Sequence, residues 1–167
     1  MNIILIGFMG CGKTIVGQRL ASHLKRDFYD IDGEIENNAG MTISQIFEKH
    51  SEGHFRQLEK TTILRVSKLD NVVIATGGGA ILDEENKMAL KENGKVVYLT
   101  WAFNDLWQYI ENCSKRPLLK NKSKDEIEAL FNERKKHYSK AADFSINCTP
   151  ETYNNLDHFI KLIVTCY

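Results

Sequence analysis

The sequence is short of several features that define whole classes of protein. Its 167 residues include only two prolines and no tract dominated by one residue type, which excludes collagen-like and low-complexity chains. Its 22 basic side chains balance its 22 acidic ones, so no overall field attracts nucleic acid or an anionic membrane. Because 43% of the residues are hydrophobic, there is apolar surface for a sizeable core, and we expect residues 1–167 to form a single domain.

Long apolar runs and closely spaced cysteines are also missing. The longest apolar stretch, residues 3–12, has about half the length that spans a bilayer, and it lacks the basic segment and cleavage site of a signal peptide. The four cysteines form no C-x-x-C pair, which favours reduced thiols over a disulfide framework or a zinc site. We therefore expect a cytoplasmic protein that binds neither nucleic acid nor a membrane.

Strand-like and helix-like segments alternate along the chain, and this order predicts an α/β fold with a parallel sheet. β-branched and apolar runs predict five strands, at residues 2–6, 27–29, 71–75, 95–100 and 144–147. Five strands are enough for a doubly wound, three-layer α/β/α core.

Helix starts and one buried helix face can also be predicted. Thr42 with Gln45, and Ser123 with Glu126, have the spacing of a capping box. Asp83 is expected to open a helix that ends at Gly94. Apolar residues from 156 to 164 recur with the helical period, which predicts a final helix packed on the core.

A phosphate-binding motif follows the first predicted strand. Residues 7–14, GFMGCGKT, match G-x-x-x-x-G-K-[ST] and lead into an amphipathic segment. Glycine allows a loop to turn successive backbone N–H groups toward a phosphate, and the next helix adds its N-terminal dipole. The residues expected to contact the nucleotide here are Gly10, Cys11, Gly12, Lys13, Thr14 and Ile15. Among them, Lys13 would bridge the β- and γ-phosphates, and the Thr14 hydroxyl would ligate Mg²⁺.

Two carboxylates end the second predicted strand. Asp30 and Asp32 are two residues apart and would share a face of that strand. One could hold the water shell of Mg²⁺ while the other accepts a proton from an attacking hydroxyl. An acid-rich helix start is the alternative interpretation. The D-x-x-G pattern of residues 30–33 also suggests a GTPase, but no N-K-x-D motif is present to read guanine.

Glycines and one arginine suggest an acceptor site at the same edge of the sheet. Residues 76–80, TGGGA, follow the third predicted strand and would let a second substrate approach the backbone. Arg56 lies in a helical stretch and either binds a planar carboxylate or pairs with Glu52 or Glu59.

Basic residues later in the chain suggest a lid. The polar connection at residues 112–124 holds Arg116, which closure would bring to the transferred phosphoryl group while excluding water. Arg134, one turn from Tyr138, either faces the same cleft or belongs to a solvated basic face.

In this order and spacing, the motifs resemble the shikimate kinase family over essentially the whole chain. The segments that carry the resemblance are residues 7–14, 30–32, 55–59, 76–79, 116–119, 134–138 and 142–143. The resemblance implies a P-loop kinase fold and Mg²⁺-dependent transfer of the ATP γ-phosphoryl group to the 3-hydroxyl of shikimate. The products would be shikimate 3-phosphate and ADP, in aromatic amino-acid biosynthesis.

The same resemblance implies roles for individual residues. Arg56 and Arg134 would hold the carboxylate of shikimate, and the Gly78 backbone would bind a further oxygen of the same molecule. Asp32 would orient the reacting hydroxyl, and Asp30 would reach Mg²⁺ through water. The catalytic residues would be Lys13, Asp32 and Arg116, the substrate-binding region would span about residues 31–60, and the lid about 112–124.

Two alternatives remain at this point. One is another small-molecule P-loop kinase, such as a gluconate-type kinase, because the phosphate machinery does not identify the acceptor. The other is an ATP-binding module without catalysis. We expect a monomer, because the long apolar helix face is needed for the core.

Overall fold

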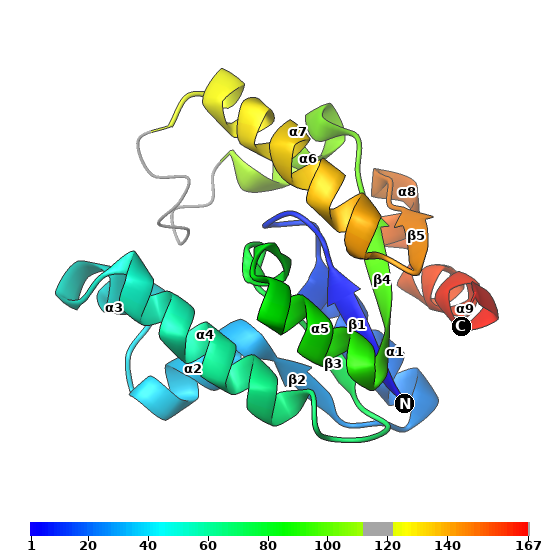
Figure 1. Ribbon diagram of the computed structural model, residues 1–167. Coiled ribbons are helices and arrows are strands. Elements are labelled where there is room, and N and C mark those ends of the chain that lie inside the picture. The colour runs from blue at the N-terminus through cyan, green and yellow to red at the C-terminus, as the bar shows by residue number, and fades with distance from the viewer. Residues whose placement is uncertain (112–121, 167) are drawn as a thin grey trace.

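In the computed structural model, which describes residues 1–111 and 122–166, five parallel strands form one sheet in the order β2-β3-β1-β4-β5. The strands are β1 (Asn2–Ile6), β2 (Phe28–Asp30), β3 (Val73–Ala75), β4 (Gly94–Thr100) and β5 (Phe144–Asn147). Helices cover both faces of the sheet (Figure 1). The predicted three-layer α/β/α fold with five parallel strands is therefore confirmed.

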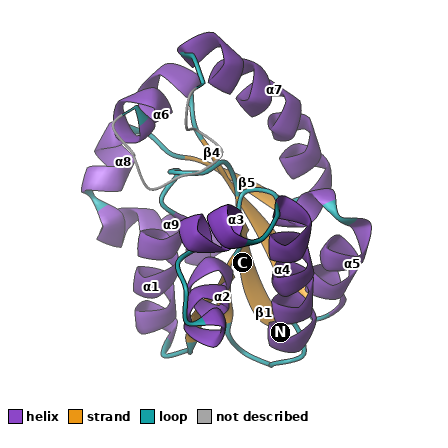
Figure 2. Cartoon of the chain, turned by 90° about the vertical axis from the view of Figure 1, so that its left-hand side faces the viewer, coloured by secondary structure: helices purple, strands orange, loops and turns teal. Residues whose placement is uncertain are grey.

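The helices fall into groups around this sheet (Figure 2). Their bounds are α1 (Lys13–Leu24), α2 (Ile31–Ala39), α3 (Ile43–Lys49), α4 (Glu52–Val66), the 3₁₀ turn η1 (Ala80–Leu82), α5 (Glu84–Glu92), α6 (Phe103–Ile110), α7 (Lys124–Ala141), α8 (Pro150–Asn154) and α9 (Leu156–Cys166). Helices α1 and α9 pack together on one face, and α4 and α5 on the other. None of the helices in the described residues is long and apolar enough to cross a membrane.

The middle strand explains why the sheet is buried on both faces. Ile3, Ile4, Leu5 and Ile6 of β1 are fully buried, and the continuous apolar run is typical of a parallel strand covered by helices on both sides. Gly94 pairs with Asn2 at the start of β4, where a Cβ atom would lie 1.9 Å from Ile4 Cδ1. The prediction that Gly94 ends a helix was wrong, because close strand packing requires this glycine.

The predicted helix starts are confirmed. Both capping boxes form at Thr42 and Ser123, and the Asp83 carboxylate caps α5. A third capping box at Thr149 opens α8, and the sequence analysis missed it. In α9, the predicted apolar stripe buries Phe159, Ile160 and Ile163.

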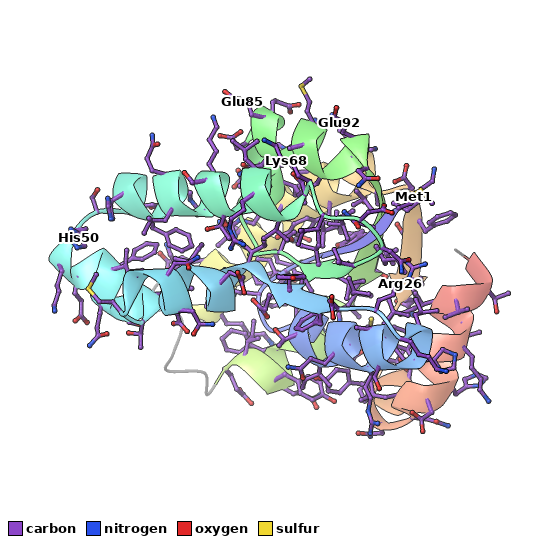
Figure 3. All side chains as sticks on the ribbon, turned by 90° about the horizontal axis from the view of Figure 1, so that it is seen from below. Met1, Arg26, His50, Lys68, Glu85 and Glu92 are labelled. Carbon is purple, nitrogen blue, oxygen red and sulfur yellow. The ribbon has the colours of Figure 1, made fainter. Side chains whose placement is uncertain are left out.

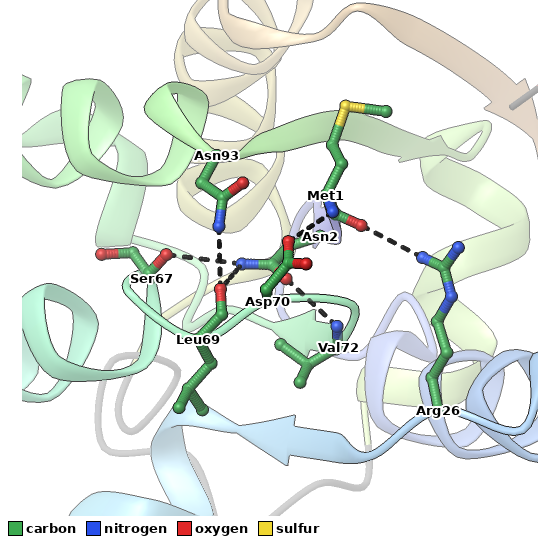
Figure 4. Close-up of polar contacts among 8 residues, drawn as sticks. All are labelled: Met1, Asn2, Arg26, Ser67, Leu69, Asp70, Val72 and Asn93. Carbon is green, nitrogen blue, oxygen red and sulfur yellow. Dashed lines mark hydrogen bonds and ion pairs between the residues drawn. The ribbon is translucent and has the colours of Figure 1, made fainter.

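A polar network closes the amino-terminal edge of the sheet (Figure 4). Asn2 Nδ2 donates to the carbonyl oxygens of Leu69 at 2.7 Å and Ser67 at 3.4 Å, and Asn2 Oδ1 accepts from Val72 N–H at 3.1 Å. Asn93 Nδ2 also donates to Leu69 O, at 2.9 Å. These bonds tie the connections before β3 and β4 to β1.

Residues 31–60, the predicted substrate-binding region, form α2, α3 and the first part of α4. These helices pack on one another and extend from the sheet as far as His50, whereas Met1 and Arg26 lie at the opposite end of the molecule (Figure 3).

Candidate active site

The carboxyl ends of three neighbouring strands bring the predicted site segments together. Asp30 of β2 pairs with Ala75 of β3, and Ala75 pairs with Leu5 of β1. The phosphate-binding loop after β1, Asp30 and the glycines after β3 therefore lie side by side at one edge. Open α/β sheets bind ligands at this edge.

The phosphate-binding loop requires glycine at two positions. Gly10 and Gly12 have φ angles of 80° and 88°, in the left-handed region that side chains with a Cβ disfavour. A Cβ atom on Gly10 would also lie 2.1 Å from Ile110 Cγ2. Lys13 begins α1 and is 8% exposed, and its Nζ donates to Gly7 O at 2.8 Å and Phe8 O at 3.0 Å. The lysine charge therefore faces the loop itself.

Thr14 and Asp30, both predicted to serve Mg²⁺, contact each other, but Asp30 and Asp32 do not share a strand face. The Thr14 hydroxyl donates to Asp30 Oδ2 at 2.5 Å. Asp30 ends β2 and is the N-cap of α2, and its Oδ1 accepts from Asp32 N–H at 3.1 Å. Asp32 lies in the first turn of α2. The strand interpretation was wrong because aspartate strongly favours the N-cap position, so the helix begins there.

The oxygen atoms of Thr14 and Asp30 fit a magnesium ion. Mg²⁺ prefers hard oxygen ligands and is usually held by one or two side chains together with substrate phosphates and water. Among residues 1–111 and 122–166, no group of three or more His, Cys, Asp and Glu side chains is placed to hold a metal by itself. A hydroxyl and a carboxylate beside a phosphate-binding loop match a metal that arrives with a nucleotide.

The glycine turn after β3 packs tightly against charged side chains. A Cβ atom on Gly77 would lie 2.7 Å from Glu59 Oε1 and 2.9 Å from Asp32 Oδ1. A Cβ atom on Gly79 would lie 2.7 Å from Arg56 Nη1. The missing side chains therefore let three charged groups from α2 and α4 approach the backbone. The close approach of a second substrate to this turn stays a prediction.

The structure shows Arg56 paired with acidic side chains, and binding of a planar carboxylate by this arginine stays a prediction. Its guanidinium pairs with Glu59 at 2.7 Å and with Glu52 at 3.1 Å, and it also lies against Gly79. Burial raises the pKa of the Glu59 carboxyl, and the charge of Arg56 opposes that shift. Glu59 is 1% exposed, so it holds Arg56 at the turn from inside the protein.

Arg134 and Tyr138 reach the same turn from α7. Arg134 is 7% exposed, so the alternative of a solvated basic face was wrong for this residue. Its Nη1 would lie 3.6 Å from a Cβ atom on Gly78, and the Tyr138 hydroxyl donates to Gly78 O at 2.6 Å. Within the described residues, Arg134 Nε and Nη1 have no hydrogen-bond partner. A buried guanidinium with unused donors is suited to binding an anion.

Three aromatic residues beside the phosphate-binding loop were missed. Trp101 Nε1 donates to Cys11 O at 3.2 Å, and the Tyr153 ring would meet a Cβ atom on Gly12 at 2.5 Å. The rings of Trp101, Tyr109 and Tyr153 lie within 5.4–5.9 Å of one another. The position of Trp101 directly after the fourth predicted strand was the available signal.

Arg116 and most of the predicted lid lie outside the described residues.

Comparison with known proteins identifies the family. A family model described as shikimate kinase matches residues 9–164. The chain belongs to the shikimate kinase family. The shikimate kinase of Caldicellulosiruptor saccharolyticus is 47% identical over 87% of this chain and 85% of its own length. That of Pelotomaculum thermopropionicum is 41% identical over 96% of this chain and 95% of its own.

A solved structure agrees with this assignment to the shikimate kinase family. Shikimate kinase from Acinetobacter baumannii, in complex with shikimate, is similar with a TM-score of 0.89 and 36% identity, covering 98% of this chain and 93% of that chain. As a shikimate kinase family member with this fold, the protein is an ATP-dependent kinase.

Proposed function

We propose that this protein transfers the γ-phosphoryl group of ATP to the 3-hydroxyl of shikimate, giving shikimate 3-phosphate and ADP. The observation that carries the acceptor is Arg134, a buried guanidinium whose Nε and Nη1 lack partners among the described residues. It lies at the same glycine turn as Arg56. Two arginines suit one planar carboxylate, and the similar enzyme from Acinetobacter baumannii is described in complex with shikimate.

On the acceptor side, Arg56 and Arg134 bind the carboxylate, and the Gly78 backbone contacts a further oxygen of shikimate. Asp32 orients the 3-hydroxyl and accepts its proton as the oxygen attacks the γ-phosphorus. Its Oδ1 already faces the turn, 2.9 Å from the Cβ position of Gly77. Residues 31–60 supply two of these four groups, Asp32 and Arg56, in what we take to be a single kinase domain.

On the phosphate side, Lys13 exchanges the carbonyl oxygens of Gly7 and Phe8 for the β- and γ-phosphates of ATP. Thr14 and, through water, Asp30 would hold Mg²⁺, whose chemistry here is to neutralise charge on the phosphate oxygens. The role of Arg116 at the transferred group rests on the sequence alone. Gly10, Cys11, Gly12 and Ile15 complete the nucleotide-binding segment.

An ADP-release assay with MgATP tests this function. The acceptors are shikimate, gluconate, AMP and none, each in a separate reaction. We expect ADP formation that depends on shikimate. The matched control, Asp32→Asn, should bind MgATP normally and lose turnover by about 100-fold or more. ADP release that depends on gluconate instead would assign a different acceptor. Nucleotide binding without ADP release in any reaction would indicate an ATP-binding module without catalysis.

A further inference from the structure

We propose that Tyr138 is a positioning residue of the acceptor site: its hydroxyl fixes the peptide between Gly78 and Gly79 so that the glycine turn presents its N–H groups to the acceptor. The identity of the acceptor rests on the proposed function, whereas the geometry of the turn is independent of that function.

Among the described residues, the three glycines use their carbonyl groups as acceptors and leave their N–H groups without an acceptor. Gly77 O accepts from Ala80 N at 3.2 Å, and Gly79 O accepts from Leu82 N at 3.1 Å. Gly78 O accepts from the Tyr138 hydroxyl at 2.6 Å. Within the described part of the chain, no hydrogen bond is donated by the N–H group of any of these glycines. Gly77 and Gly79 are buried and Gly78 is partly buried. Buried backbone N–H groups are nearly always paired, so a turn whose N–H groups have no acceptor in the described residues is suited to binding ligand oxygens.

The hydrogen bond from Tyr138 sets the direction of the Gly79 N–H group. The peptide between Gly78 and Gly79 is trans and planar, so its N–H and C=O point in opposite directions. Because the carbonyl faces Tyr138 on α7, the Gly79 N–H points away from α7. Gly79 itself lies against the Arg56 guanidinium. Without the hydroxyl, this glycine peptide has little to prevent its rotation, because glycine accepts backbone angles on both sides of φ = 0.

The position of Tyr138 couples this peptide to the carboxylate site. Tyr138 follows Arg134 by four residues on α7, and both approach Gly78. Tyr138 is 1% exposed, and its ring packs on that of Tyr98 of β4 with 5.2 Å between the ring centroids. This packing holds the Tyr138 hydroxyl in place. Gly78 also lies near the phosphate-binding loop, because its Cβ position is 3.4 Å from Met9 N. One hydroxyl therefore aligns the acceptor turn with the arginine and with the loop.

Tyr138→Phe tests this role, and Tyr98→Phe is the matched control. Both variants keep a buried ring in the same aromatic pair and lose only a hydroxyl. In Tyr138→Phe, we expect the KM for shikimate to rise about five- to tenfold, the loss of one neutral hydrogen bond. The kcat and the KM for MgATP should stay within about twofold of wild type, because Tyr138 holds the Gly78 peptide, which contacts an oxygen other than the reacting 3-hydroxyl. Tyr98→Phe should leave all three constants unchanged.

A readout without substrate separates this inference from the proposed function. In ¹⁵N–¹H spectra of the free protein, the Gly79 amide should shift and exchange faster in Tyr138→Phe but not in Tyr98→Phe. An unchanged Gly79 amide would overturn the proposal, whatever the protein phosphorylates. Equal changes in the KM for shikimate in both variants would also overturn it, since that result indicates general loosening. Absence of shikimate turnover in wild type would contradict only the proposed function.

Discussion

The two edges of the sheet bury polar groups in opposite ways. At the amino edge, the side chain of Asn2 is 1% exposed, and its amide nitrogen and oxygen are both hydrogen-bonded to backbone groups. At the carboxyl edge, Arg134 is 7% exposed, and two of its nitrogen atoms have no partner among the described residues. Glu59 Oε1 is likewise buried without a hydrogen bond there.

The free-energy cost of burying a polar group explains the difference between the two edges. A satisfied buried hydrogen bond contributes about 1 kcal/mol to stability, whereas an unsatisfied buried polar group costs about 1–3 kcal/mol. Native proteins leave few such groups unsatisfied. The amino edge therefore stabilises the sheet, and the carboxyl edge keeps donors ready for a ligand at the expense of stability. The two edges should respond to mutation in opposite ways.

Arg134→Met should give the largest functional effect. It replaces the guanidinium by an apolar side chain and removes the unpaired donors. We expect kcat/KM for shikimate to fall about 100-fold or more, the usual scale for a buried charged contact to a ligand. The free energy of unfolding in urea should change little, because the loss of two unsatisfied buried donors offsets the lost attraction to Glu59. A clear loss of stability with an unchanged KM for shikimate would make Arg134 a structural residue and remove the contrast.

Asn2→Ala should give the largest stability effect with no functional one. It leaves Val72 N–H without its side-chain partner, and it leaves the Leu69 carbonyl with Asn93 alone. We expect the free energy of unfolding to fall by about 2–3 kcal/mol, while kinetic constants per folded molecule stay at wild-type values. Asn93→Ala, which removes a single bond to Leu69 O, is the milder control. A changed KM for shikimate in Asn2→Ala would show that the two edges are coupled.

Glu59→Gln tests the contrast between the two edges through the pH dependence of the free energy of unfolding. Burial raises the pKa of the Glu59 carboxyl above its ordinary value of 4.5, so the folded state binds this proton more tightly than the unfolded chain. The stability from this carboxyl is fully present below about pH 4.5 and is lost as pH rises through the folded pKa. The unfolding free energy of wild type minus that of Glu59→Gln should therefore fall as the pH rises above 4.5. Glu52→Gln, which changes the exposed partner of Arg56, is the matched control.

The sequence predicts the carboxyl edge better than the amino edge, and topology explains why. The phosphate-binding loop is one contiguous motif, and the order of strands and helices places Asp30 and the glycine turn beside it. By contrast, Asn2 looks like an ordinary first residue of a strand, because its partners Ser67, Leu69 and Val72 lie far along the chain. Local patterns also left Asp30 ambiguous between strand and helix cap, and only the three-dimensional structure showed Tyr138 bonded to Gly78.

Asp70→Asn should give the smallest effect, although it lies at the amino edge. Asp70 pairs with the Met1 ammonium group, and both are largely exposed. The hydrogen bond from that ammonium lowers the pKa of Asp70 below its ordinary value of 3.8. Its stabilising contribution is thus present above that pH and is lost as pH falls through the lowered pKa. At pH 7, we expect a smaller shift of the urea midpoint than for Asn2→Ala, and it should vanish in about 1 M salt, which screens exposed charges. A shift as large as that of Asn2→Ala would mean that the amino edge depends on surface charge, and burial would no longer explain the difference between the two edges.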